Sequence, residues 1–335
     1  MYIFGMESSC DETSAAVIHA DEAGNLTIKS NIVASQVDVH RLYGGVVPEI
    51  ASRAHVEAVS RITREALETA GITVADLDCV AVTANPGLIG ALLVGVNFAK
   101  SFAFANKIPL VAVNHIHAHV GAAYLSHQGL RAPFIALVVS GGHTQFYRVD
   151  TDTKYTEIGG TRDDAAGESF DKVGRVIGMP YPGGAALDKL AYEGNSKAYA
   201  LPSPALAGDS PDFSFSGIKT AALNLINGAN QRGEQINAAD MAASYTSAIV
   251  KGIVKQTEKV LVQTGTPVLV LAGGVAANSH LRSALQQLCQ AHKVTLVVPP
   301  LSLCGDNGAM VAAAGYFEYM SGARAGTDLN ASAYD

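Results

Sequence analysis

Short apolar runs separated by small polar turns fill the first part of the chain. Tyr2–Met6, Ser14–His19 and Leu26–Ala34 are rich in apolar residues and predict three strands. Helical apolar spacing over about His55–Ala70 ends at Gly71, a residue typical of the position just after a helix. Further elements, strand and helix in turn, are expected at Cys79–Ala84, Leu88–Phe104, Ile108–Val113 and Val120–Ser126. Strands that alternate with helices indicate an α/β lobe.

The strand–turn–strand pattern of the N-terminus occurs a second time, about 130 residues later, which indicates a duplicated lobe. Phe134–Val139 and Gln145–Val149 predict strands around the small-residue turn Ser140–Thr144, and Glu7–Thr13 is the equivalent turn of the first half. Such a turn can wrap backbone N–H groups around an anion, although an ordinary hairpin has the same pattern. We expect the two turns to face one another across a cleft and to hold the phosphates of a nucleotide.

The rest of the second half predicts α/β elements that meet at small-residue turns. Asp163 and Asp164 are expected in the first turn of a helix, where the helix dipole favours acids. Gly273-Gly274 lets a ligand approach the backbone closely. The alternative is that the two glycines serve only the packing of the strand against the helix. From spacing alone, Asp306 is expected at the N-cap or in the first turn of the last helix, and the cap is the favoured position. These elements are expected at Asp163–Ile177 (helix), Pro267–Leu271 (strand), Ser279 onward (helix), Val294–Val298 (strand) and Ala309–Tyr319 (helix).

The segment Asn114–His119 carries the most distinctive chemistry of the chain. If it is helical from its first residues, His115 and His119 lie at i and i+4 on one face, where two imidazoles can share one metal ion. His117 points elsewhere. A solvated or simply packed pair is the alternative, but sites in α/β proteins gather where strands end and helices begin.

Composition and length set limits on the class of protein. The chain has 335 residues, of which 48% are hydrophobic and 16% charged, and this suits two lobes. We expect residues 1–130 to form lobe I, joined by the C-terminal helix 306–325, and residues 131–305 to form lobe II. Gly87–Ala105 is apolar enough to raise a membrane question, but Asn97, Lys100 and Ser101 interrupt it and favour a buried helix.

Charge and cysteine content indicate the compartment and the partners. The net charge of −7 is unusual for a free-standing nucleic-acid binder, so such a partner would need a local patch or helper proteins. Four widely spaced cysteines without a Cys-x-x-Cys motif indicate reduced thiols. No export signal is evident, and we expect a cytoplasmic location.

Eight short motifs follow one another between Gly5 and about Tyr319. They are Glu7-Ser-Ser-Cys-Asp-Glu-Thr, Gly44-Gly-Val-Val-Pro-Glu-Ile-Ala-Ser-Arg, Asn114-His-x-x-x-His, Val139-Ser-Gly-Gly-His-Thr, Asp163-Asp-Ala-Ala-Gly-Glu, Tyr181-Pro-Gly-Gly, Ala272-Gly-Gly-Val-Ala-Ala-Asn and Cys304-Gly-Asp-Asn. In this order they resemble the motifs of the TsaD family, the tRNA N6-adenosine threonylcarbamoyltransferases. The implied fold is that of actin, Hsp70 and the sugar kinases (ASKHA), with duplicated ribonuclease-H-like lobes around a nucleotide cleft.

The resemblance also implies site residues. It implies that His115, His119 and Asp306 hold one divalent ion per subunit, Fe2+ by the usual family assignment, with Zn2+ as the alternative. Asp11 and Glu12 are the catalytic candidates, because either could orient or deprotonate an incoming amine. Substrate contacts, with an adenine nucleotide in the cleft, are implied for Val138, Val139, Ser140, Gly141, Gly142, Asp171, Gly184, Asp188 and Asn278.

The activity that the resemblance implies is acyl transfer. Threonylcarbamoyl-AMP would donate its threonylcarbamoyl group to N6 of adenosine 37 in tRNAs that read codons beginning with A, forming t6A and releasing AMP. The target base must leave its stack to reach a cleft. The implied partners are tRNA, a TsaB-like catalytically empty paralogue and a TsaE-like small ATPase, with no membrane.

Three other functions compete with acyl transfer. A metallopeptidase would place a glutamate directly after the first histidine, and Ile116 is there instead. A non-catalytic scaffold of the same fold would not need His115, His119 and Asp306. A sugar or acetate kinase would share the lobes but has no use for the histidine pair.

Overall fold

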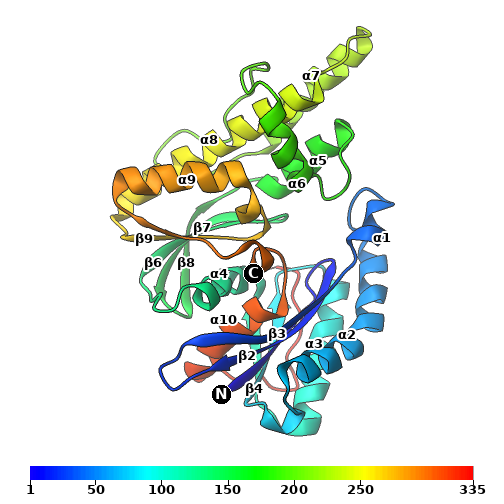
Figure 1. Ribbon diagram of the computed structural model, residues 1–335, viewed down its shortest axis with the longest axis vertical. Helices are drawn as coiled ribbons and strands as arrows, with labels where there is room; N and C mark the ends of the chain where they lie inside the picture. Colours follow the sequence, from blue (N-terminus) through cyan, green and yellow to red (C-terminus); the bar gives the residue numbers. More distant parts are fainter. Residues whose placement is uncertain (335) are drawn as a thin grey trace. The chain divides into compact units, whose positions relative to one another are not determined.

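The chain folds into two compact units, as seen in a computed structural model that describes residues 1–334 (Figure 1). Unit 1 contains Met1–Ala132, Asp150–Lys154 and the residues from Pro299 onward, and unit 2 contains Pro133–Val149 and Tyr155–Val298. Each unit holds one five-stranded sheet of mixed direction, on which helices pack.

The sheet of unit 1 has the strand order β3-β2-β1-β4-β5. β1 pairs antiparallel with β2 and parallel with β4, so that Tyr2 lies opposite His19 and Ile3 lies opposite Cys79. The strands are β1 (Tyr2–Glu7), β2 (Glu12–Ala20), β3 (Leu26–Ser35), β4 (Cys79–Asn85) and β5 (Leu110–Asn114). The helices are α1 (Val37–Arg41), α2 (Pro48–Ala70), α3 (Ile89–Asn106), α4 (His115–Ser126) and α10 (Gly308–Met320).

The alternation of side chains along β1 decides which of them face which helices. Phe4 and Met6 pack into a core cluster with apolar residues of α2 and α3. Gly5 points to the other face, where a Cβ would overlap the carbonyl oxygen of Gly308 at the start of α10. Glu7 follows Gly5 by two residues, so the pleat turns its carboxylate to the α10 face of the sheet.

The long apolar helix α3 is a core helix of unit 1. Within the described residues it is the one helix long and apolar enough to cross a membrane by length and composition, a test that core helices also pass. Leu92, Val96 and Ala99 are fully buried, and the last two join the core cluster beneath β1. The Lys100 ammonium donates to the carbonyl oxygen of Leu329, 2.8 Å away. These contacts bury one side of α3, whereas Ile89 and Phe104 are 47% and 74% exposed, so the helix expected to be buried is only partly so.

The sheet of unit 2 repeats the topology of unit 1. Its order is β10-β9-β6-β7-β8, with β6 antiparallel to β7 and parallel to β9, as β1 is to β2 and β4. The strands are β6 (Phe134–Val139), β7 (Thr144–Thr151), β8 (Lys154–Gly160), β9 (Val268–Ala272) and β10 (Thr295–Val297). The helices are α5 (Ala166–Val176), α6 (Gly183–Leu190), α7 (Ser216–Gln231), α8 (Ala238–Thr264) and α9 (Ser279–His292). The predicted α/β class with duplicated lobes is confirmed.

Two expectations about helix ends are wrong. Asp163 lies outside α5, which begins at Ala166, and it caps α7 instead. Its carboxylate accepts the N–H groups of Phe215 and Ser216, at 2.7 and 3.1 Å. Asp163 does lie at the positive end of a helix dipole, but the helix is α7, which tertiary folding brings to it. Likewise, α2 begins at Pro48 and not near His55, because proline suits the first position of a helix.

Candidate metal centre and substrate residues

The histidine pair lies at the start of α4, directly after β5. The side chain of Asn114 accepts the N–H groups of Ile116 and His117, at 2.8 and 3.1 Å, and so begins the helix at His115. His115 and His119 are 6% and 1% exposed, and their ring centroids are 4.7 Å apart. The predicted one-face arrangement of the pair is therefore present, and the pair is buried.

Asp306 reaches the histidines through the packing of α10 and not by capping that helix. Asn307 is the N-cap, and its side chain accepts the N–H of Met310 at 3.0 Å. The expectation that Asp306 caps the helix is therefore wrong. Asp306 Oδ1 lies 3.3 Å from His119 Nε2 and 3.7 Å from His115 Nε2.

Glycines bring α10 close enough to place Asp306. The N–H of Gly308 donates to Ser14 Oγ at 2.8 Å, and a Cβ on Gly308 would lie 2.7 Å from the backbone nitrogen of Ala16. On α4, a Cβ on Gly121 would lie 2.9 Å from the carbonyl oxygen of Met310. The start of α10 therefore packs backbone to backbone against β2 and α4.

The three side chains fit a metal ion. Their ligand atoms all lie within 4.8 Å of one another. Bonds of about 2.0–2.2 Å to one ion put neighbouring ligand atoms about 3–3.5 Å apart, close to the 3.3 and 3.7 Å that separate Asp306 Oδ1 from the two Nε2 atoms. Both ring nitrogens of His119 are buried without a hydrogen-bond partner among the described residues. A buried imidazole without partners is costly, and a bound cation at Nε2 would remove part of that cost.

The turn between β1 and β2 contributes two further groups to this region. Ser9 Oγ lies 3.1 Å and Glu7 Oε2 lies 3.2 Å from His115 Nδ1. Burial raises the pKa of Glu7, but the neighbouring His115 ring and the hydrogen bonds outweigh burial, so this pKa lies below its ordinary value. Analysis of the sequence missed Glu7, although a carboxylate that ends an apolar central strand is a visible signal.

Protonation differs along the rest of this turn. Burial, with repulsion from Asp306 and Asp11, raises the pKa of Glu12 to about 10. Burial raises the pKa of the Cys10 thiol well above its ordinary value, so Cys10 is not a thiolate at neutral pH. His55, also missed from the sequence, ties α2 to the turn, because its Nε2 lies 3.0 Å from the carbonyl oxygen of Cys10.

In unit 2, the β6–β7 turn that was expected to bind an anion is closed by hydrogen bonds between its first and last residues. Ser140 closes it: its N–H donates to the carbonyl oxygen of His143, and its hydroxyl accepts the N–H of His143, at 2.7 and 3.1 Å. Gly141 and Gly142 are exposed. The side chains of Val138 and Val139 are fully buried in the core, so a ligand could meet these two residues only through their backbone.

The other predicted substrate residues lie on α5, on α6 and at the start of α9. Asp171 Oδ1 accepts the N–H of Gly184 at 3.0 Å. Asp188 Oδ2 accepts both the N–H and the hydroxyl of Ser279, at 3.0 and 2.8 Å. Asn278 is the N-cap of α9 and accepts the N–H of Leu281. Asp188 therefore already has a structural role at α9, and a ribose would have to share its oxygens.

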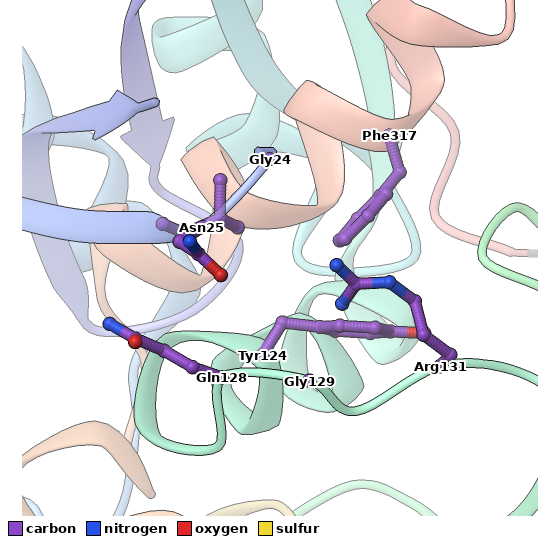
Figure 2. A pocket seen from close by; sticks show the side chains of 8 residues that line it. Gly24, Asn25, Tyr124, Gln128, Gly129, Arg131 and Phe317 are labelled. Carbon is purple, nitrogen blue, oxygen red and sulfur yellow. The ribbon is translucent and has the colours of Figure 1, made fainter. Parts of the chain in front are cut away.

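A small pocket of unit 1 contains none of the predicted site residues. Figure 2 shows its lining: Gly24 and Asn25 of the β2–β3 turn, Tyr124 of α4, Phe317 of α10 and the side chain of Arg131. The chemistry of unit 1 thus gathers at the His–His–Asp cluster. Two units of one topology, one of them carrying that cluster, define a two-lobed α/β protein with a candidate metal centre.

Comparison with known proteins identifies the family. The TsaD family model, described as tRNA N6-adenosine threonylcarbamoyltransferase, matches residues 27–313. Relatives of that name from Geobacillus thermodenitrificans and Clostridium botulinum (strain 657) are 51% and 47% identical, covering 99% and 98% of this chain and 96% of each relative. Full-length HypF in its phosphate- and nucleotide-bound form has the same fold over 100% of this chain and 47% of its own, at 14% identity and a TM-score of 0.62. The chain belongs to the TsaD family, as its motifs predicted.

Proposed function

We propose that this chain transfers the threonylcarbamoyl group of threonylcarbamoyl-AMP to N6 of adenosine 37 in tRNAs that read codons beginning with A. The supporting observation is 47–51% identity with curated threonylcarbamoyltransferases along nearly the whole chain. In this reaction the N6 nitrogen bonds to the carbonyl carbon, and the bond from that carbon to the phosphate oxygen of AMP breaks. The amine loses one proton, and the products are t6A and AMP.

We assign one divalent ion to His115, His119 and Asp306, with Fe2+ as the first candidate and Zn2+ as the second. The buried ring nitrogens of His119, which have no hydrogen-bond partner among the described residues, support this assignment. Two imidazoles and one carboxylate leave coordination positions open, as a catalytic site requires. When bound, the ion would supply positive charge for the carbonyl oxygen, on which negative charge develops.

Asp11 and Glu12 are the carboxyl groups that we assign to the incoming amine. Burial and the neighbouring Asp11 raise the pKa of Glu12 and favour its protonated form, which can donate a hydrogen bond to the substrate. Asp11, 7% exposed, is then our candidate to accept the amine proton. A cation beside Asp306 would weaken the repulsion on Glu12 and lower its pKa. Positioning and charge must provide most of the acceleration, because an exocyclic amine is a poor nucleophile.

We assign the adenylate to the predicted residues of unit 2. The backbone N–H groups of Gly141 and Gly142 suit its phosphate. Asp171 and Asp188 suit the ribose hydroxyls, with Gly184 beside them and Asn278 towards the adenine. Because the chain carries a net charge of −7, we expect tRNA capture to depend on a TsaB-like paralogue and a TsaE-like ATPase.

The decisive experiment is a transfer assay. The purified chain, with its candidate partners, is incubated with threonylcarbamoyl-AMP and unmodified tRNA, and the tRNA nucleosides are then identified by mass. We expect t6A and an equal amount of AMP. Formation of AMP without t6A would refute transfer to tRNA, and full activity of His119→Ala would refute the assigned metal site. Cleavage of a peptide substrate without tRNA modification would favour the metallopeptidase alternative.

A further inference from the structure

A fully buried carboxylate lies beside His115, at the ring nitrogen that does not face Asp306. Glu7 is 0% exposed, and its Oε2 is 3.2 Å from His115 Nδ1. The other ring nitrogen, Nε2, is 3.7 Å from Asp306 Oδ1. The imidazole therefore lies between two carboxylates, of which only one belongs to the His–His–Asp cluster.

Two donors fix the orientation of the Glu7 carboxylate. The Thr83 hydroxyl donates to Oε2 at 2.6 Å, and the Ser9 N–H donates to Oε1 at 2.5 Å. The pleat of β1 already turns Glu7 to this face of the sheet. An ionised carboxylate has acceptors only, so in its contact with His115 the imidazole must supply the proton.

We propose that Glu7 is the positioning residue that makes His115 a metal ligand. By accepting the Nδ1–H of His115, Glu7 selects the tautomer whose Nε2 lone pair is free, and it fixes the plane of the ring. Nε2 is the nitrogen that faces Asp306. This inference rests on the proposed metal site, and it assigns Glu7 a role that the His–His–Asp cluster does not include.

The charges of the region support this assignment. Glu7 and Asp306 bring two negative charges into a region where Glu7 is fully buried. A buried charge is stable only when it is compensated. One divalent cation at the cluster would balance the two carboxylates. Among the described residues, neither ring nitrogen of His119 has a hydrogen-bond partner, and its Nε2 lies 3.3 Å from Asp306 Oδ1, where a cation could replace that contact.

The hydroxyl of Ser9 is the competing partner of His115. It lies 3.1 Å from His115 Nδ1, as close as Glu7 does, and it could also accept the Nδ1 proton. A hydroxyl can equally donate to a bare Nδ1, so it does not select one tautomer, whereas a carboxylate does. The two side chains therefore make different predictions for metal binding.

The test substitutes Glu7→Gln and, as the matched control, Ser9→Ala. A glutamine amide that accepts from Ser9 N–H turns its NH2 group to His115 Nδ1, which favours the opposite tautomer and puts a proton on Nε2. Chelator-treated full-length protein is titrated with Co2+, and binding is followed by visible absorption and calorimetry. We expect Glu7→Gln to weaken Co2+ binding by about 10–100-fold, and Ser9→Ala by a much smaller factor.

The outcomes distinguish a failure of the proposed metal site from a failure of the role proposed for Glu7. If the unmodified chain does not bind Co2+, the proposed metal site fails, and this inference fails with it. If the unmodified chain binds Co2+ and Glu7→Gln binds it equally well, only the role of Glu7 is refuted. Should Glu7→Gln not fold, 15N NMR of the Zn2+-loaded Ser9→Ala chain, in which Glu7 is the remaining partner of Nδ1, decides: a proton on His115 Nδ1 supports the proposal, and a bare Nδ1 overturns it.

Discussion

The position of Asp306 depends on a contact that a single methyl group can break. In Gly308→Ala, the new Cβ would stand 2.7 Å from the backbone nitrogen of Ala16 and 2.9 Å from the carbonyl oxygen of Gly5. These neighbours are backbone atoms of the central strands, so they cannot swing aside. The start of α10 must then retreat by about 0.7 Å, the difference between 2.7 Å and an ordinary contact of 3.4 Å.

This retreat has two consequences of different size. Overpacking costs about 1–3 kcal/mol, and the better helix propensity of alanine returns up to about 1 kcal/mol, so we expect unfolding to become easier by about 1–2 kcal/mol. Asp306 lies two residues before Gly308 and would move with it. A metal site tolerates errors of about 0.2 Å in its bond lengths, so we expect metal affinity and transfer activity to fall on the order of 10–100-fold.

The assay is urea unfolding together with Co2+ titration of the chelator-treated protein. Gly217→Ala is the matched control, because Gly217 lies in α7 and a Cβ there would meet nothing within 4 Å. That substitution should stabilise the chain by up to about 1 kcal/mol and leave metal binding unchanged. Unaltered stability and Co2+ affinity in Gly308→Ala would refute the claim that backbone packing of α10 sets the position of Asp306.

Three further predictions concern the same residues. His119→Ala should abolish Co2+ binding and t6A formation while His117→Ala, on another face of α4, keeps both; metal retained by His119→Ala would contradict the cluster. The pKa of Glu12 is about 10 in the folded chain and near 4.5 in the unfolded chain. Between these values the folded chain keeps the proton and the unfolded chain loses it. The free energy of unfolding should therefore fall between about pH 5 and 9, by up to about 1.4 kcal/mol per pH unit. In metal-free urea unfolding, Glu12→Gln should remove this part of the pH dependence, and parallel curves for the two proteins would refute it. Asp163→Ala should cost about 1–2 kcal/mol in urea unfolding and loosen α7, measured by amide exchange, whereas loosening of α5 alone would mean that the assigned cap is wrong.

Local sequence was sufficient for much of the fold and for the histidine pair of the candidate metal centre. Continuous apolar runs predicted β1, β4 and β6, because a strand covered on both faces has few polar positions. The i,i+4 spacing of His115 and His119 predicted their shared face, since helix geometry is a property of neighbouring residues. No element was assigned from the sequence to α7 and α8, where small and polar residues blur the apolar period.

Contacts between distant residues were decided only by the tertiary structure. Spacing alone made Asp306 a helix cap, and only the family resemblance placed it with the two histidines. In the structure it is a neighbour of His119 because glycine lets α10 rest directly on the backbone of β1 and β2. Asp163 was expected in the first turn of α5. It caps α7 instead, because the fold brings Phe215 at the start of α7 next to its carboxylate. Glu7 meets His115 because β1 and β5 belong to one sheet and α4 begins where β5 ends. Such pairings depend on how closely two backbone segments can pack, and the order of apolar and polar residues along the chain does not encode that distance.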